Sequence, residues 1–197
     1  MLFPVDLLVL GDARTVKATA YIVESGREPD LNLIDTVKNA GFSVIEPFSG
    51  LSTVERRMAE TPICFFLFTH TRDTEPLRRV VHQVRSCKRR NVRFSPLIYF
   101  CQNPSQELIA NCLSLGFDDV ITLPQKAAQI GNRLNFQLNK PIVYFETPHY
   151  FGPDRRREPR PQSDGSHKSQ LGASHQRFEF VRAEDGIAIK TRQAIAA

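Results

Sequence analysis

The sequence lacks three common enzyme signatures, and it lacks any apolar segment long enough to cross a membrane. There is no Gly-x-Ser-x-Gly, no Walker loop and no His-Glu-x-x-His in the 197 residues. There is also no run of eighteen apolar residues, so we expect no transmembrane helix and no membrane insertion. Residues 1–10 are apolar but lack the basic start of a signal peptide, and we therefore predict a cytoplasmic protein.

Cysteine pairs of the metal-binding kind are absent as well. The four cysteines form no Cys-x-x-Cys pair. Cys64 and Cys101 fall inside apolar runs, and Cys112 lies on the apolar side of an expected helix. Free thiols buried in a reducing compartment are therefore predicted, rather than a zinc site. We expect no metal and no cofactor.

Basic residues outnumber acidic ones, which gives a net charge of +5 and an isoelectric point of about 9.2. A moderately basic chain admits nucleic acid, anionic lipid or an acidic protein as a partner, and it selects none of them. No helix-turn-helix follows the expected sheet, and no aromatic-rich strand pattern suits single-stranded nucleic acid. A nucleic-acid partner is therefore disfavoured.

Apolar runs and helical patterns alternate five times along the chain, with short connections between them. The run at 62–69 is apolar on both faces, which is typical of a central parallel strand covered by helices on both sides. This alternation predicts an α/β, flavodoxin-like fold: a doubly wound sheet of five parallel strands in the order 2-1-3-4-5. The expected strands are 20–23, 43–47, 62–69, 96–101 and 119–122, and the expected helices are 31–40, 52–60, 74–90, 105–115 and 125–138.

The composition changes at about residue 146. Proline, glycine, serine, arginine and histidine dominate the stretch that follows, and little there can bury a core. We therefore predict an N-terminal extension over 1–18, a sheet domain over 19–146, and a largely disordered, flexible basic tail over 147–197. Within the tail, residues 176–181 alternate weakly and predict a short strand, and residues 187–197 predict a marginal helix.

The run from Leu115 to Gln125, Leu-Gly-Phe-Asp-Asp-Val-Ile-Thr-Leu-Pro-Gln, reads as a helix end, a glycine turn, a buried strand and a proline-marked loop. It resembles the last strand of a CheY-like receiver domain, the phosphate-accepting module of bacterial two-component signalling. The resemblance covers residues 20–139. It implies working groups at the carboxyl ends of the strands: an acidic pair for Mg²⁺, a phosphate-accepting Asp, a Ser or Thr, and a Lys.

Most of these chemical groups are missing, although the fold pattern remains. Glu24 and Ser25 follow the first strand, so at most one carboxylate of the acidic pair is left. Thr69 follows the third strand, where the phosphate-accepting Asp belongs. Cys101 replaces the hydroxyl residue and Leu123 replaces the lysine. The chain therefore resembles a degenerate pseudo-receiver, and we predict a non-catalytic signalling protein rather than an enzyme.

Two other interpretations stay open. Asp73, four residues past Thr69, could act as a displaced phosphate acceptor in an unusual response regulator. A loop acid ahead of a helix start is the simpler interpretation of that residue, because it is favourable near the helix dipole. The chain could also be a nucleotide- or nucleic-acid-binding adaptor.

One set of candidate partner-binding residues lies on the helix expected at 74–90. Arg78, Arg85 and Arg89 share one stripe of that helix with His82. The stripe is either a docking face for an acidic partner or a solvated face opposite an apolar one.

A second candidate set lies in the segment Tyr-Phe-Gly-Pro-Asp-Arg-Arg-Arg at 150–157. Its aromatics could anchor a short linear motif while its arginines pair with carboxylates or phosphates. A linker with incidental charge is the competing interpretation. The candidate residues are Tyr150, Phe151, Arg155, Arg156 and Arg157.

The resemblance also implies where a partner would bind. Receiver domains commonly pair and dock through their fourth helix, fifth strand and fifth helix. We therefore expect residues 105–115 and 125–138, with the strand between them, to contact one or more signalling proteins. A homodimer through the same face stays open.

Overall fold

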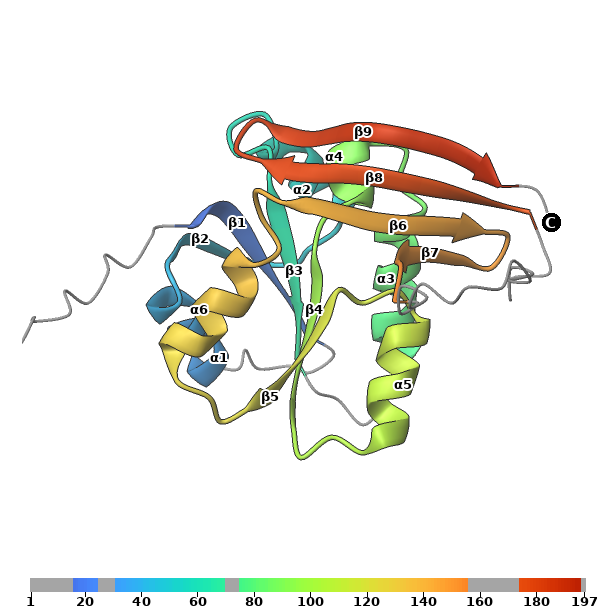
Figure 1. Ribbon diagram of the computed structural model, residues 1–197. Coiled ribbons are helices and arrows are strands. Elements are labelled where there is room, and N and C mark those ends of the chain that lie inside the picture. Colours follow the sequence, from blue (N-terminus) through green and yellow to red (C-terminus); the bar gives the residue numbers. More distant parts are fainter. Residues whose placement is uncertain (1–15, 25–30, 70–74, 156–173, 196–197) are drawn as a thin grey trace, which may run out of the picture.

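The computed structural model describes residues 16–24, 31–69, 75–155 and 174–195 (Figure 1). Its larger sheet has five strands in the order β2-β1-β3-β4-β5, and every neighbouring pair is parallel, as predicted. The strands are β1 (Val16–Val23), β2 (Phe42–Pro47), β3 (Cys64–Phe68), β4 (Leu97–Gln102) and β5 (Asp119–Leu123), and the helices are α1 (Leu31–Asn39), α2 (Leu51–Arg57), α3 (Glu75–Arg85), α4 (Arg90–Arg93), α5 (Gln106–Ser114) and α6 (Ala127–Asn135).

The central strand β3 is buried on both faces because helices cover both sides of the sheet. All five of its residues are at most 1% exposed. Phe65 and Leu67 pack into one apolar cluster with α1 and α6, whereas Phe66 and Phe68 pack into a second cluster with α2, α3 and α5. The continuous apolar run of the sequence thus corresponds to a strand between two helical layers.

The helix expected over 74–90 is interrupted. α3 ends at Arg85, and the short α4 begins at Arg90. At the end of α3 the backbone N–H and the hydroxyl of Ser86 both donate to the carbonyl oxygen of His82 (2.9 and 2.7 Å). Arg89 therefore lies in a connection and not on α3.

The prediction of a disordered tail is wrong for most of the tail residues that the structure describes. A second sheet, antiparallel and of four strands, has the order β7-β6-β8-β9. The short strand expected at 176–181 is part of the longer β8, and the expected C-terminal helix is the strand β9. The bounds are β6 (Pro141–Thr147), β7 (Tyr150–Pro153), β8 (His175–Ala183) and β9 (Gly186–Ile195).

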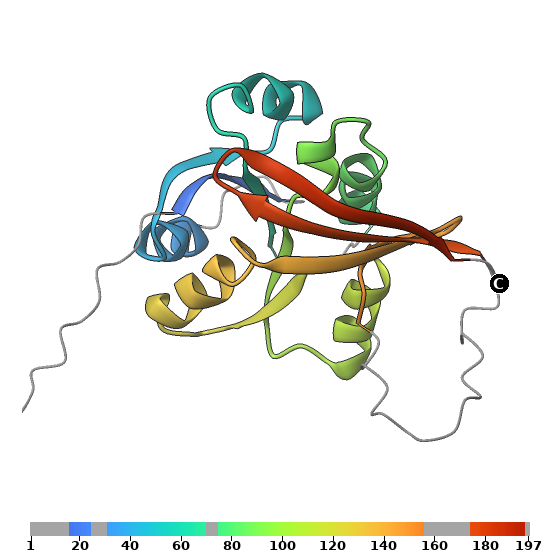
Figure 2. The same ribbon diagram turned by 45° about the horizontal axis from the view of Figure 1, so that its top comes forward.

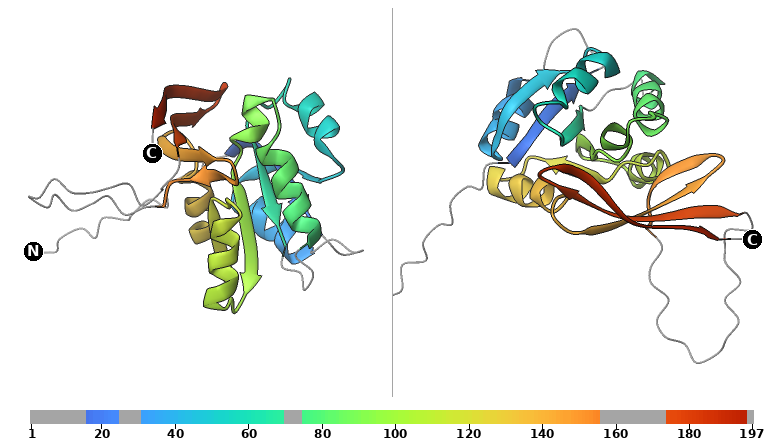
Figure 3. Two further views of the ribbon diagram at one scale, coloured as in Figure 1. Left: turned by 90° about the vertical axis from the view of Figure 1, so that its right-hand side faces the viewer. Right: turned by 90° about the horizontal axis from the view of Figure 1, so that it is seen from above.

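The second sheet folds because alternate residues of its strands supply apolar side chains to the main core. Phe178 and Phe180 on β8 and Tyr144 on β6 are at most 4% exposed. All three pack around Phe94, which precedes β4, with ring centroids 4.7 to 5.8 Å apart. Figures 2 and 3 show the second sheet lying across the amino ends of the parallel strands. The opposite, carboxyl edge of the parallel sheet is left uncovered by it.

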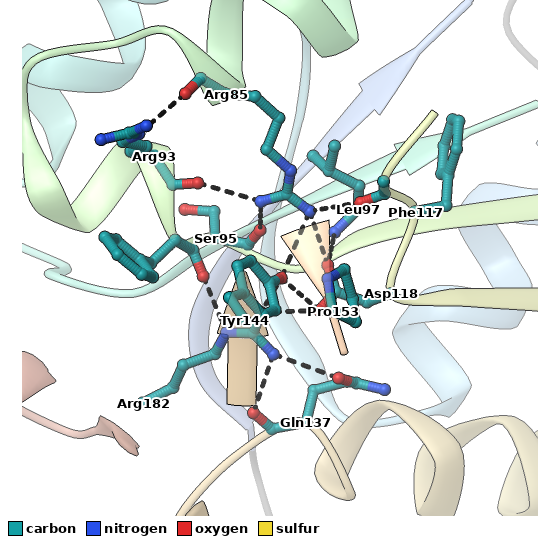
Figure 4. A network of polar contacts seen from close by, with 12 residues as sticks. Arg85, Arg93, Ser95, Leu97, Phe117, Asp118, Gln137, Tyr144, Pro153 and Arg182 are labelled. Atoms are coloured by element: carbon teal, nitrogen blue, oxygen red, sulfur yellow. Dashed lines mark hydrogen bonds and ion pairs between the residues drawn. The ribbon is translucent and has the colours of Figure 1, made fainter. Parts of the chain in front are cut away.

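A buried carboxylate, Asp118, joins the two sheets (Figure 4). One of its oxygens accepts hydrogen bonds from Arg85 of α3 (2.9 Å) and from the backbone N–H of Leu97 (2.8 Å). The other accepts from Arg182 of β8 (2.7 Å) and from the Tyr144 hydroxyl of β6 (2.5 Å). Asp118 therefore binds one cation from a helix that packs on the parallel sheet and one from the second sheet.

Both arginines of this network are almost fully enclosed. Arg182 is 0% exposed and Arg85 is 6% exposed. Arg182 also donates to the carbonyl oxygen of Phe94 (2.8 Å), and Arg85 donates to those of Ser95 and Gly116 (2.9 and 2.8 Å). Burial alone would raise the pKa of Asp118, but the two guanidiniums outweigh it and lower that pKa below its ordinary value.

Replacing Asp118 by Asn should strongly destabilise the protein. The substitution leaves Arg85 and Arg182 buried without a counter-charge, which costs about 3–5 kcal/mol of the free energy of unfolding. Asp119→Asn is the matched control, because Asp119 pairs with Arg133 at a partly exposed position and should cost at most about 1 kcal/mol. Urea unfolding of both variants measures the difference. Equal losses would show that the buried pairing does not join the sheets.

Candidate functional site

The carboxyl edge of the parallel sheet is the place where a flavodoxin-like fold positions its chemistry. Glu24 follows β1 at this edge, whereas Ser25 lies outside the described residues. Thr69 follows β3, is partly exposed, and donates its backbone N–H to the carbonyl oxygen of Val23 (3.2 Å). Asp73, the alternative phosphate acceptor, is also outside the described part of the chain.

The β4 and β5 positions of this edge are apolar. Cys101 is 1% exposed, and burial raises the pKa of its thiol. Leu123 is partly buried and packs against the main core, and its peptide bond to Pro124 is cis. Among the described residues, no three His, Cys, Asp or Glu side chains gather into a metal site. The thiol and the leucine offer a phosphate neither a charge nor a strong hydrogen-bond donor.

The arginine stripe expected on one helix does not exist as a single surface. Arg78 is exposed on α3, and its guanidinium lies 3.8 Å from the carboxylate of Glu75. Arg89, in the connection to α4, is exposed and lies 2.8 Å from Glu55. Arg85 points inward to the buried network, so its prediction as a partner-binding residue is wrong. The helical period places Arg85 on the same stripe as the exposed arginines. Its guanidinium can nevertheless be buried, because the carboxylate of Asp118 pairs with it.

The segment at 150–157 is docked onto the protein over its described part. Phe151 is 8% exposed, and its ring packs against Phe94 and Tyr144 at centroid distances of 5.1 and 5.5 Å. Tyr150 stacks on Phe145 at 4.7 Å. These aromatics thus anchor the chain to itself, which corrects their prediction as residues for a separate partner. Arg156 and Arg157 lie outside the described residues.

Two glycines allow this segment to approach the turn between α5 and β5. Gly116 has a φ of 92°, and a Cβ there would lie 2.7 Å from the carbonyl oxygen of Phe151. A Cβ on Gly152 would lie 2.8 Å from the Cα of Gly116. Arg155 completes the contact by donating to the carbonyl oxygens of Phe117 and Asp118 (2.6 and 2.8 Å). The exposed Arg155 side chain therefore also has a partner within the chain.

The candidate functional site lies on the face formed by α5, β5 and α6, which we call the docking face. It contains a hollow of about 480 Å³ beside α6. The guanidinium of Arg133 on α6 donates two hydrogen bonds, of 2.9 and 2.6 Å, to the carboxylate of Asp119 on β5. This bidentate pair fixes the polar part of the lining. The lining residues are Asp118, Asp119, Asn132, Arg133, Phe136 and Gln137.

Phe136 at the end of α6 gives this face its apolar contact. Its side chain is 67% exposed, and no other large hydrophobic residue of the described chain is comparably exposed. The ammonium group of Lys140 lies over its ring, which is a cation–π contact. Burial, with the nearby charge of Arg182, lowers the pKa of Lys140. An exposed aromatic next to a hollow and a fixed ion pair can bind an amphipathic protein surface.

The sequence predicted a docking face on two helices and a strand, which stays a prediction, but it did not select Phe136. A signal was available, because the apolar stripe of this helix comprises Ala127, Ile130, Leu134 and Leu138, and Phe136 falls outside it. The apolar stripe packs into the core, and a large aromatic off the stripe must face solvent.

Two solved structures are similar to this chain. A CheY-like protein, TadZ from Pseudomonas aeruginosa, matches with a TM-score of 0.46 and 13% identity, over 60% of this chain and 98% of that chain. The N-terminal domain of the nisin resistance regulator NsrR, a lantibiotic response regulator, matches with a TM-score of 0.41 and 18% identity, over 60% and 96%. No protein-family model and no curated protein matches the sequence. The fold assignment therefore rests on the strand order and the parallel pairing.

A search of the described helices for a membrane span finds none that is long and apolar enough.

Gly116→Ala should release the docked segment at a measurable cost. The new Cβ meets the backbone of Phe151, so the free energy of unfolding should fall by about 1–3 kcal/mol more than in Gly50→Ala. Gly50 is the matched control, because it too has a positive φ but has open space around it. Urea unfolding gives the two stabilities, and hydrogen exchange should show faster exchange at residues 150–153 in Gly116→Ala alone. Similar effects of the two variants would contradict a close backbone contact.

Proposed function

We propose that this chain is a non-catalytic signalling protein of the pseudo-receiver kind, which acts by binding another signalling protein through its docking face. The observation that carries this function is the exposed Phe136 beside the hollow of α6. At protein interfaces, aromatic residues beside a pocket are common anchors of the binding energy.

The composition of the carboxyl edge supports the non-catalytic part of this function. Phosphoryl transfer to a receiver needs a carboxylate acceptor and Mg²⁺, and hard cations need several oxygen ligands. Glu24 is the carboxylate that remains at the described edge, while Thr69, Cys101 and Leu123 occupy the other family positions. Control would then come from the abundance or the binding of the partner and not from phosphorylation.

The surroundings of Phe136 indicate what the partner presents. The rigid pair of Arg133 and Asp119 offers a guanidinium and a carboxylate close to an apolar ring. A matching surface carries an apolar side chain for Phe136 and polar groups around it, as at the core and rim of a standard interface. Four free cysteines, three of them buried, suit the reducing cytoplasm, where we place this interaction.

Photo-crosslinking in the native cell tests this function directly. Benzoylphenylalanine is introduced at Asn132, which lines the hollow, and separately at Arg79, which is exposed on α3. We expect a discrete adduct with a signalling protein from position 132, identified by mass spectrometry, and none from position 79.

Phe136→Ala supplies the second half of that experiment. In the chain labelled at position 132, it should lower the yield of the adduct about tenfold or more, the loss expected for an aromatic anchor. Stability should change little, because the ring is exposed. Equal adducts from positions 132 and 79, or an unchanged yield with Phe136→Ala, would refute the docking face.

A further inference from the structure

The second sheet has one edge that the described chain covers only at its start, where Asn91 of α4 contacts Gly186 and Ile187. Its strand order places β7 at one edge and β9 at the other. β7 has four residues, ends at Pro153, and lies on the turn that contains Gly116. Such a short, covered, proline-ended edge cannot pair with another strand. The β9 edge differs in each of these respects.

β9 is ten residues long, contains no proline, and pairs with β8 alone among the described strands. Figures 1 and 3 show it at the outer side of the sheet, with no helix beyond it. At the start of β9 the backbone N–H of Ile187 donates to the side chain of Asn91 on α4 (3.2 Å). Beyond that point, no described residue outside the sheet bonds to the backbone N–H and C=O groups on its free side. An edge of this kind is a template on which an extended segment can add a further strand.

The pairing between β9 and β8 is regular over the last five residues of β9. Thr191 to Ile195 lie opposite Glu179 to His175 without interruption. An irregularity precedes this stretch, because Phe180 pairs with Ile189 and Lys190 has no opposite residue. The regular edge available to a new strand is therefore 191–195, and Lys190 stands at its start.

The charge of this edge is of one sign. β9 carries Lys190 and Arg192 and has no acidic residue. Both are exposed, and neither forms an ion pair with another described residue. Arg192 is instead held by a hydrogen bond to Gln176 (2.8 Å) and lies over the ring of Phe178. Its charge is thus fixed at the edge without being neutralised.

We propose that the β9 edge at 191–195 binds an extended acidic segment of a partner protein, which adds to the second sheet as a fifth strand. Backbone hydrogen bonds supply the affinity, while Lys190 and Arg192 select carboxylates on the incoming segment. This site is separate from the docking face, so it stands or falls independently of the function proposed above.

The same charges disfavour a second copy of the chain as the occupant. Pairing two β9 strands would bring four cations along one seam, and like charges near one another across strands are destabilising. Lysine at an irregular position of an edge strand is a common device against self-pairing. An acidic segment turns this repulsion into attraction, because the opposite residues then differ in sign.

Fluorescence anisotropy with defined peptides tests the proposal. The probe is a fluorescein-labelled peptide of eight alternating glutamate and valine residues, and its control has lysine in place of glutamate. The full chain should bind the glutamate peptide and not the lysine peptide. Lys190→Glu combined with Arg192→Gln should weaken binding about tenfold, whereas Lys38→Glu on α1 should leave it unchanged. Equal binding of both peptides, or equal effects of these variants, would overturn the proposal.

Hydrogen exchange of the wild-type chain keeps the test decisive if the double variant fails to fold. Bound glutamate peptide should slow amide exchange within 191–195, since a new strand occupies their free edge. Slowing elsewhere with none at β9 would assign the binding to another basic surface and refute the site. Sedimentation of the chain alone should give the same oligomeric state for the wild type and for Lys190→Glu. A dimer that this substitution abolishes or strengthens would make a second copy the occupant.

Discussion

The pairing of Asp118 with Arg85 and Arg182 is the interaction on which the arrangement of this protein depends. One carboxylate, 2% exposed, receives a guanidinium from α3 and another from β8. Two cations against one anion leave an excess of buried positive charge, which the Tyr144 hydroxyl and several backbone carbonyl oxygens help to solvate. Such a cluster contributes little net stability compared with apolar packing, but breaking it is costly. It therefore specifies where the second sheet lies.

That position determines which surfaces remain for function. The second sheet covers the amino ends of the parallel strands, and its β7 edge lies on the turn at Gly116. The second sheet does not cover the carboxyl edge, which carries Thr69, Cys101 and Leu123 where the receiver pattern has an Asp, a hydroxyl residue and a Lys. We propose that two other surfaces bind proteins: the docking face around Phe136 and the free edge of β9. A fold used elsewhere for phosphate transfer would then serve for binding here.

The parallel sheet could be predicted because its strands are locally unambiguous. The run ending at Phe68 is apolar on both faces, and Gly116 stops a helix at a positive φ that the sequence signals directly. The second sheet was missed because prolines, glycines and arginines outnumber the apolar residues in the stretch 147–176, which separates most of β6 from most of β8 in the sequence. Arg182 interrupts the alternation of Phe178 and Phe180 by lying on the buried side, where a charged residue is not expected. Its partner Asp118 lies 64 positions away, and no local pattern connects the two.

We predict that this chain does not accept a phosphoryl group, and acyl-phosphate formation tests that prediction most directly. The full chain is incubated with radiolabelled acetyl phosphate and Mg²⁺, beside a receiver domain that retains its acceptor Asp. We predict no stable label on this chain while the receiver domain becomes labelled. Label that survives gel filtration and disappears with Asp73→Ala would contradict a non-catalytic function and identify a displaced phosphate acceptor.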